Sequence, residues 1–127
     1  MNKMNKNVET IDERGKKHEL RNNLADLVGQ KVEFEGVLTK CYEDTQKLLI
    51  REINDTNGQY VTKHCHMFIN GNKNRQKDKE RIDKMFQELQ KIEGRRVKFV
   101  GKVTQYSTKS QKINYGISYF VKLIDII

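Results

Sequence analysis

Two stretches of the chain alternate apolar and polar residues in nearly the same order. Residues 94–106 read GRRVKFVGKVTQY, and residues 29–42 read GQKVEFEGVLTKCY. A period of two residues is typical of a strand with one buried face. Each stretch has a glycine near its centre, Gly101 in one and Gly36 in the other, and such a glycine permits a bulge or a sharp bend. We therefore expect two long, bent strands.

Three further strands are predicted around this pair. Residues 47–53 (KLLIREI) and 59–69 (QYVTKHCHMFI) are joined by NDTNG, and Asn-Gly is a strong hairpin signal. Residues 115–127 are mostly apolar, as in a strand buried on both sides. Within residues 59–69, alternation predicts a buried face of Val61, Cys65, Met67 and Ile69. The opposite face then carries Tyr60, Thr62, His64, His66 and Phe68.

Two segments carry the helical period instead. Over residues 76–92 one stripe contains Ile82, Met85, Phe86, Leu89 and Ile92, with Gly94 after its end. Residues 16–29 predict a shorter helix that covers an open end of the sheet, with Gly29 as its left-handed cap and a stripe of Leu20, Leu24, Leu27 and Val28. Residues 1–15 are polar, and we expect a mobile tail there.

The element order resembles that of the OB-fold, a partly open five-stranded Greek-key barrel. The order is strand, strand, strand, helix, strand, strand, and the resemblance covers residues 30–127. A length of 127 residues suits a single domain. We therefore predict a mainly β protein: a flexible tail over residues 1–15, a helix over 16–29 and an OB-fold domain over 30–127.

The positive charge is distributed unevenly along the chain. The formal net charge is +8. Residues 94–124 contain no acid, and they contain the basic residues Arg95, Arg96, Lys98, Lys102, Lys109, Lys112 and Lys122. The rest of the chain carries 18 basic and 17 acidic residues, so nearly all of the excess lies in this segment. A one-sided basic surface favours a polyanionic partner, and the alternative is a solvated basic surface that maintains solubility.

The resemblance to OB-folds implies an oligonucleotide site on the second and third strands and on two loops, one between strands one and two and one between strands four and five. Single-strand binding needs cations for phosphates and rings on which bases stack. Two structural alternatives to ligand binding stay open. In one, Tyr60 and Phe68 close the barrel ends; in the other, Tyr42 and Tyr106 pack on each other. Carried onto this chain, the resemblance implies Tyr42, Lys47, Arg51, Tyr60, His64, His66, Tyr106, Lys109, Lys112 and Tyr115 as candidates. The basic charge of the predicted strand over residues 94–106 adds Lys98 and Lys102.

Signals for catalysis, metals and cofactors are weak. His64 and His66 share a strand face and could chelate a metal, but they need a further ligand, and Cys65 between them points the other way. The chain contains no GxxxxGK[ST], GxSxG, HExxH or GxGxxG motif. The acid-free basic segment lacks the carboxylates of a two-metal nuclease. We therefore expect no enzyme activity, no bound metal and no cofactor.

The sequence thus predicts a non-catalytic protein that binds single-stranded nucleic acid, with DNA favoured over RNA. Its richness in Lys, Asn and Ile suits an AT-rich genome, so a phage or mobile-element accessory to replication or recombination is expected. The alternative is a protein-interaction module, an inhibitor or adaptor whose basic face docks an acidic protein or a nucleoprotein complex of replication or defence.

The expected location follows from features that the sequence lacks. We expect no membrane association, because no apolar run approaches about 20 residues and the N-terminus lacks a signal-peptide core. Only two cysteines are present, which is typical of a cytoplasmic protein. Either a monomer or a dimer paired through strand edges is expected.

Overall fold

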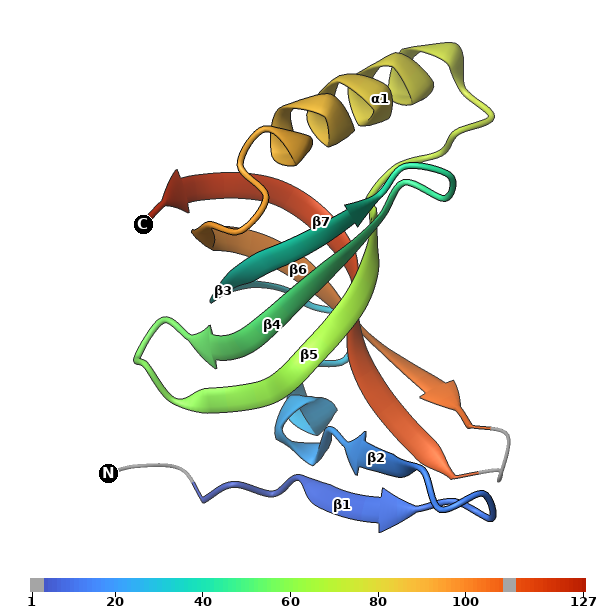
Figure 1. The fold of residues 1–127 in the computed structure, drawn as a ribbon, viewed down its shortest axis with the longest axis vertical. Coiled ribbons are helices and arrows are strands. Elements are labelled where there is room, and N and C mark those ends of the chain that lie inside the picture. The colour runs from blue at the N-terminus through green and yellow to red at the C-terminus, as the bar shows by residue number, and fades with distance from the viewer. Residues whose placement is uncertain (1–3, 109–111) are drawn as a thin grey trace.

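The computed structural model describes residues 4–108 and 112–127, and its main body is a closed five-stranded barrel (Figure 1). One α-helix, α1 (Gln76–Gln90), lies between the third and fourth barrel strands. Among the described residues no helix is long and apolar enough to cross a membrane. The barrel strands are β3 (Lys31–Tyr42), β4 (Lys47–Asp55), β5 (Tyr60–Ile69), β6 (Arg96–Ser107) and β7 (Ile113–Ile126).

Around the barrel the strands follow the order β3-β4-β5-β7-β6, and β6 closes onto β3. Every neighbouring pair is antiparallel except β5 and β7, which are parallel. This topology and the position of α1 are consistent with an OB-like fold. The predicted mainly β class and the element order of residues 30–127 are confirmed, and the predicted strand over residues 31–42 coincides with β3.

The two long strands that share a pattern pair with each other, as β3 and β6. Their central glycines make room for side chains of the neighbouring strands. A Cβ on Gly36 would lie 2.6 Å from Ile50 Cγ2 and 3.0 Å from a backbone oxygen, and one on Gly101 would collide with Ile117 Cγ2. The register shifts at both glycines, beside Gly36 in the β3–β4 pair and at Gly101 in the β6–β7 pair. The predicted irregularity is therefore present at both glycines. A larger side chain would not fit at either position.

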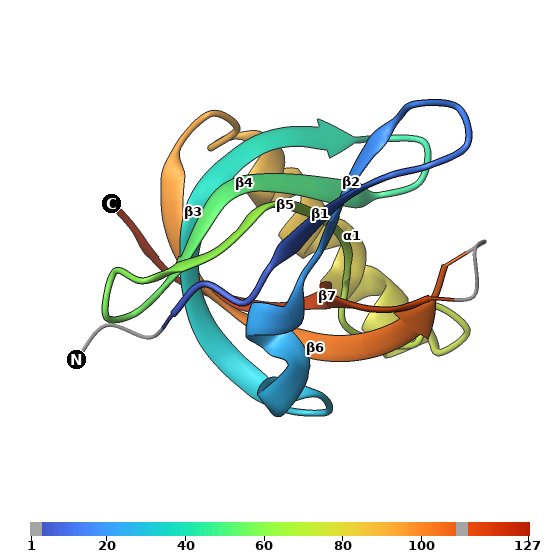
Figure 2. The ribbon, with the colours of Figure 1, turned by 90° about the horizontal axis from the view of Figure 1, so that it is seen from below.

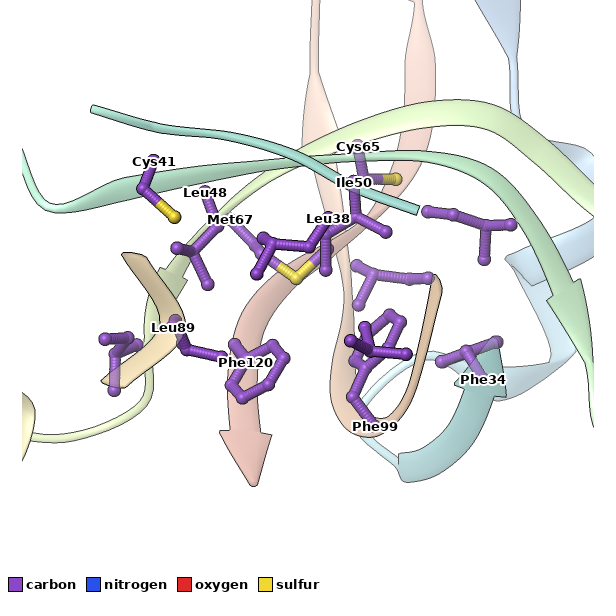
Figure 3. Packing of buried hydrophobic residues seen from close by; sticks show 14 of the residues in the cluster. Phe34, Leu38, Cys41, Leu48, Ile50, Cys65, Met67, Leu89, Phe99 and Phe120 are labelled. Atoms are coloured by element: carbon purple, nitrogen blue, oxygen red, sulfur yellow. The ribbon is translucent and has the colours of Figure 1, made fainter. Parts of the chain in front are cut away.

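The hydrophobic core fills the barrel, and α1 and the N-terminal segment cover its two ends. The rings of Phe99 and Phe120 stack with centroids 5.3 Å apart, and Phe34 lies 6.0 Å from Phe99 (Figure 3). The helix α1 covers one end of the barrel with its buried stripe of Ile82, Phe86 and Leu89 (Figure 1). Leu24 is fully buried in the same cluster and belongs to the N-terminal segment. Figures 1 and 2 place that segment at the end opposite α1.

The prediction of a helix over residues 16–29 is wrong, and part of the predicted polar tail over residues 1–15 forms a strand. The N-terminal segment forms a hairpin of β1 (Val8–Ile11) and β2 (Lys17–Leu20), followed by a 3-10 helix, η1 (Asn22–Leu27). The Asp12 carboxylate accepts hydrogen bonds from the backbone N–H groups of Arg14 and Lys16, each at 2.9 Å, and so organises the turn. Gly29 has the predicted left-handed backbone, with φ of 83°.

The helical stripe misled the prediction because the buried positions in this segment do not follow a helical period. Of its four apolar residues only Leu24 is buried, and Val28 is 39% exposed. Side-chain amides bind the segment to β5: Asn7 donates to the Val61 carbonyl at 2.7 Å, and Asn23 donates to the same oxygen at 3.2 Å. Contacts of this kind with a distant strand leave no periodic trace in the sequence.

Candidate nucleic-acid interface

The outer face of β4 and β5 brings together four of the predicted site residues. In the register of these strands Lys47 lies opposite Phe68, and Arg51 lies opposite His64. His66 is exposed on the same face, two residues beyond His64. Figures 1 and 2 show the β3–β4 turn and the free ends of β6 and β7 on one side of the barrel, flanking this face. The predicted candidates on β4 and β5 therefore share one surface.

A hollow of about 320 Å³ opens beside the β3–β4 turn. We call it the Tyr42 hollow; it is lined by Tyr42, Asp44, Thr45, Lys47 and His66. The Tyr42 and His66 rings lie 6.1 Å apart at a tilt of 43°. The lining thus combines flat rings, one ammonium group and one carboxylate. A carboxylate repels phosphate and accepts N–H donors, so the chemistry of the hollow suits a nucleobase better than a phosphate.

Lysines lie over the aromatic rings at the edge of the Tyr42 hollow. Lys40 Nζ is 5.0 Å from the centroid of the Tyr42 ring, and Lys47 Nζ is 5.7 Å from that of Phe68. Both distances are within the range of cation–π attraction. Cationic and aromatic side chains therefore alternate on this face, with each charge within reach of a ring.

The surroundings of the two histidines of this face favour their neutral forms, because both pKa values are lowered. Burial lowers the pKa of His64, and the positive charge of Arg21 lowers it further. Burial and then the Lys47 ammonium lower the pKa of His66 in the same way. Neutral imidazoles offer hydrogen bonds and ring faces. Among the described residues no group of three or more His, Cys, Asp or Glu side chains could hold a metal.

Tyr60 lies on the same strand but is tied to the N-terminal hairpin. Its hydroxyl donates to Glu19 Oε2 at 2.6 Å, and the Thr62 hydroxyl donates to Glu19 Oε1 at 2.6 Å. Burial and this hydrogen bond raise the pKa of Tyr60. For Glu19, burial acts to raise the pKa, but the bonds from Thr62, Tyr60 and the Lys63 backbone outweigh it and lower it. Thr62, predicted on the open face, is buried beneath β2.

Arg21 occupies the seam of the barrel. The parallel strands β5 and β7 pair only at two positions, after which they separate. Arg21 donates to the His64 carbonyl of β5 at 3.0 Å, to the Tyr115 carbonyl of β7 at 3.3 Å and to the Tyr106 hydroxyl of β6 at 3.0 Å. Its Nε also donates to Thr62 Oγ1 at 3.1 Å. One guanidinium therefore links β5 to the paired strands β6 and β7 where the β5–β7 ladder is missing.

A second hollow, of about 190 Å³, lies at this seam and shares His66 with the Tyr42 hollow. Its other lining residues are Arg21, Cys65, Tyr106, Gly116 and Ser118. Tyr106 and Tyr115 thus belong to the seam. The described residues show no ring contact between Tyr42 and Tyr106; Tyr42 lies against His66, and Arg21 binds the Tyr106 hydroxyl.

The segment over residues 94–124 contains no acidic residue, but an acidic residue of another strand lies beside it. Glu35 of β3 lies opposite Lys98 of β6, with Lys98 Nζ 3.9 Å and Arg96 3.8 Å from its carboxylate. Lys98 therefore faces a carboxylate on the β3–β6 side of the barrel, away from the Tyr42 hollow. Lys112 is exposed at the start of β7. Lys109 lies outside the described residues.

Comparisons of the chain with protein-family models, curated proteins and solved structures gave no match. The fold and the chemistry of the surface therefore carry the functional argument alone.

Sequence reasoning missed Glu19 and Arg21. Arg21 meets Thr62 and Tyr115 across 41 and 94 residues, and Glu19 meets Tyr60 across 41. No local pattern marks such contacts. The one available signal was the turn-forming residues Asp12 and Gly15, which argue for a hairpin rather than a tail.

Proposed function

We propose that this protein binds single-stranded nucleic acid, without catalysis, on the outer face of β3, β4 and β5. One observation carries the proposal: Tyr42, Lys47 and His66 converge on a hollow that holds rings, a cation and a carboxylate acceptor together. Single-strand binding uses this combination of stacking surfaces and cations. The OB-like topology supports the choice of this face, because OB-folds commonly bind oligonucleotides on the corresponding strands.

In this proposal an unpaired base enters the Tyr42 hollow and stacks on the Tyr42 ring. Asp44 accepts a hydrogen bond from a base N–H group, which lets a carboxylate contribute to binding a polyanion. Lys40 and Lys47 leave their rings and contact the flanking phosphates. A duplex keeps its base faces covered, so it reaches only the lysines and binds more weakly. We favour DNA over RNA because of the resemblance to single-strand DNA-binding proteins. We further propose that the protein acts in the cytoplasm and belongs to a phage or another mobile element.

The test is a fluorescence titration of labelled single-stranded DNA, single-stranded RNA and duplex DNA at several salt concentrations. Tyr42→Ala should weaken single-strand binding by about 1–3 kcal/mol, the contribution of one stacked base. Lys47→Ala should also make the slope of log K against log salt shallower by about 0.7, the value for one phosphate contact to a single strand. Lys84→Ala removes the same charge from the exposed surface of α1 and is the matched control.

Wild-type protein that binds no single strand even at low salt contradicts the proposal. So does equal affinity for single strands and duplexes, because stacking would then play no part. If no nucleic acid binds, the alternative stands, in which the basic face docks an acidic protein or a nucleoprotein complex.

A further inference from the structure

A single row of outward-facing side chains crosses all five barrel strands. Each member is the cross-strand partner of the next, from β3 through β4, β5, β7 and β6 back to the beginning of β3. Rings and cations are its only side chains. In order the row consists of Tyr42, Lys47, Phe68, Tyr119, Lys102 and Lys31.

The centre of the row is a pair of exposed rings that the core does not need. Phe68 is 42% exposed and Tyr119 is 38% exposed, and they are partners across the short parallel ladder of β5 and β7. Their chain neighbours Met67 and Phe120 fill the core beneath them. Two exposed rings on partner positions therefore form a stacking surface beyond the Tyr42 hollow, and the Lys47 ammonium lies 5.7 Å from the centroid of the Phe68 ring.

The far end of the row carries a like-charged pair. Lys31 and Lys102 are directly opposite in the β3–β6 register, an arrangement that destabilises a sheet. Neither lysine forms an ion pair with any described carboxylate, and this includes Glu33, two residues from Lys31. Four residues along the same ladder, Lys98 does face a carboxylate. An anion bound by both ammonium groups would relieve this repulsion.

We infer that a single strand held in the Tyr42 hollow continues across β5, β7 and β6 along this row. Bases stack on Phe68 and Tyr119, and phosphates bind Lys102 and Lys31. The inference rests on the proposed function and adds four residues to its site. Strands lie about 4.8 Å apart, so the four steps from Tyr42 to Lys102 span about 19 Å. Three rings take one base each, and the phosphate held by the lysine pair beyond them belongs to a fourth nucleotide, so the row holds about four nucleotides, at the lower end of the range for OB folds.

The experiment measures the affinity of the full chain for oligothymidylates of increasing length. We expect a steep rise up to about four nucleotides and a small gain per nucleotide beyond them. Tyr119→Ala and Phe68→Ala should each lower the affinity of a long oligonucleotide about 5- to 150-fold. Tyr119→Phe keeps the ring and should bind like wild type. Chemical denaturation of each variant separates lost binding from lost folding.

The contribution of the two lysines is tested through the salt dependence of the affinity. Lys102→Ala and Lys31→Ala should each make the salt slope shallower by about 0.7, whereas Lys84→Ala on α1 should not change it. If wild-type protein binds single strands and the folded Tyr119 and Lys102 variants match it, the path along the row is overturned while the proposed function stands. An affinity that saturates at one or two nucleotides overturns the path as well. If wild-type protein binds no oligonucleotide, both proposals fail.

Discussion

Replacing Arg21 with alanine removes five side-chain hydrogen bonds from the seam between β5 and β7. Two of the four acceptors are hydroxyls: the Thr62 hydroxyl keeps its bond to Glu19, and the Tyr106 hydroxyl is on an exposed ring. The His64 and Tyr115 carbonyls have fixed directions and lose their partner. An unsatisfied buried acceptor costs about 1–3 kcal/mol.

The lower part of that range applies, because Arg21 itself lines the seam hollow of about 190 Å³, and truncating its side chain lets water approach the groups that it held. We therefore expect Arg21→Ala to lower the free energy of unfolding by about 2–4 kcal/mol. That is a large share of the roughly 5–15 kcal/mol of a typical domain. Arg21→Lys keeps the charge but cannot reach three strands at once, so its loss should be intermediate.

Urea denaturation followed by circular dichroism measures this difference, since the midpoint falls while the slope stays constant if only stability changes. Arg14→Ala is the matched control: the same residue type is lost from the exposed β1–β2 turn, where the effect should stay within about 0.5 kcal/mol. If Arg21→Ala is as stable as Arg14→Ala, the guanidinium does not hold the seam together and the reasoning is refuted.

Two further predictions concern the fold. Gly36→Ala should destabilise the protein by about 1–3 kcal/mol through overpacking against Ile50, whereas Gly116→Ala, whose new Cβ would meet nothing closer than 3.5 Å, should cost much less in the same denaturation assay. Glu19→Gln should be less stable than wild type at neutral pH, and the difference should shrink as the pH falls below 4.5, because the folded-state pKa of Glu19 lies below that ordinary value. A difference between the two proteins that is independent of pH would show that the Glu19 charge contributes nothing.

The barrel was predictable because its burial is periodic. In β5, Val61, Cys65, Met67 and Ile69 are buried as the alternation indicates. The stripe of α1 is equally regular, and its predicted start at residue 76 coincides with the observed one. Where a segment packs through a single apolar residue and many polar contacts, as the N-terminal segment does through Leu24, periodicity carries no information and the prediction was wrong.

The candidate site was predictable strand by strand but not as a surface. Alternation places Lys47 and His66 on outer faces, yet it cannot say which residues of neighbouring strands lie opposite. That depends on register, and the β6–β7 pair alone contains three register shifts. A slip of one residue would turn Lys102 or Tyr119 into the core. For the same reason the sequence could not show that Glu35 faces Lys98 while Lys31 faces Lys102.

Arg21 links the stability of the fold to the geometry of the proposed site. The stacking pair Phe68 and Tyr119 sits on β5 and β7, which share only two residue pairs of ladder. Beyond that ladder, Arg21 binds a carbonyl of each strand. It contacts the row nowhere, but it limits how far the two strands can separate and therefore how far apart the two rings can move. Through Arg21, the described part of the N-terminal segment therefore braces the strands that carry the proposed row.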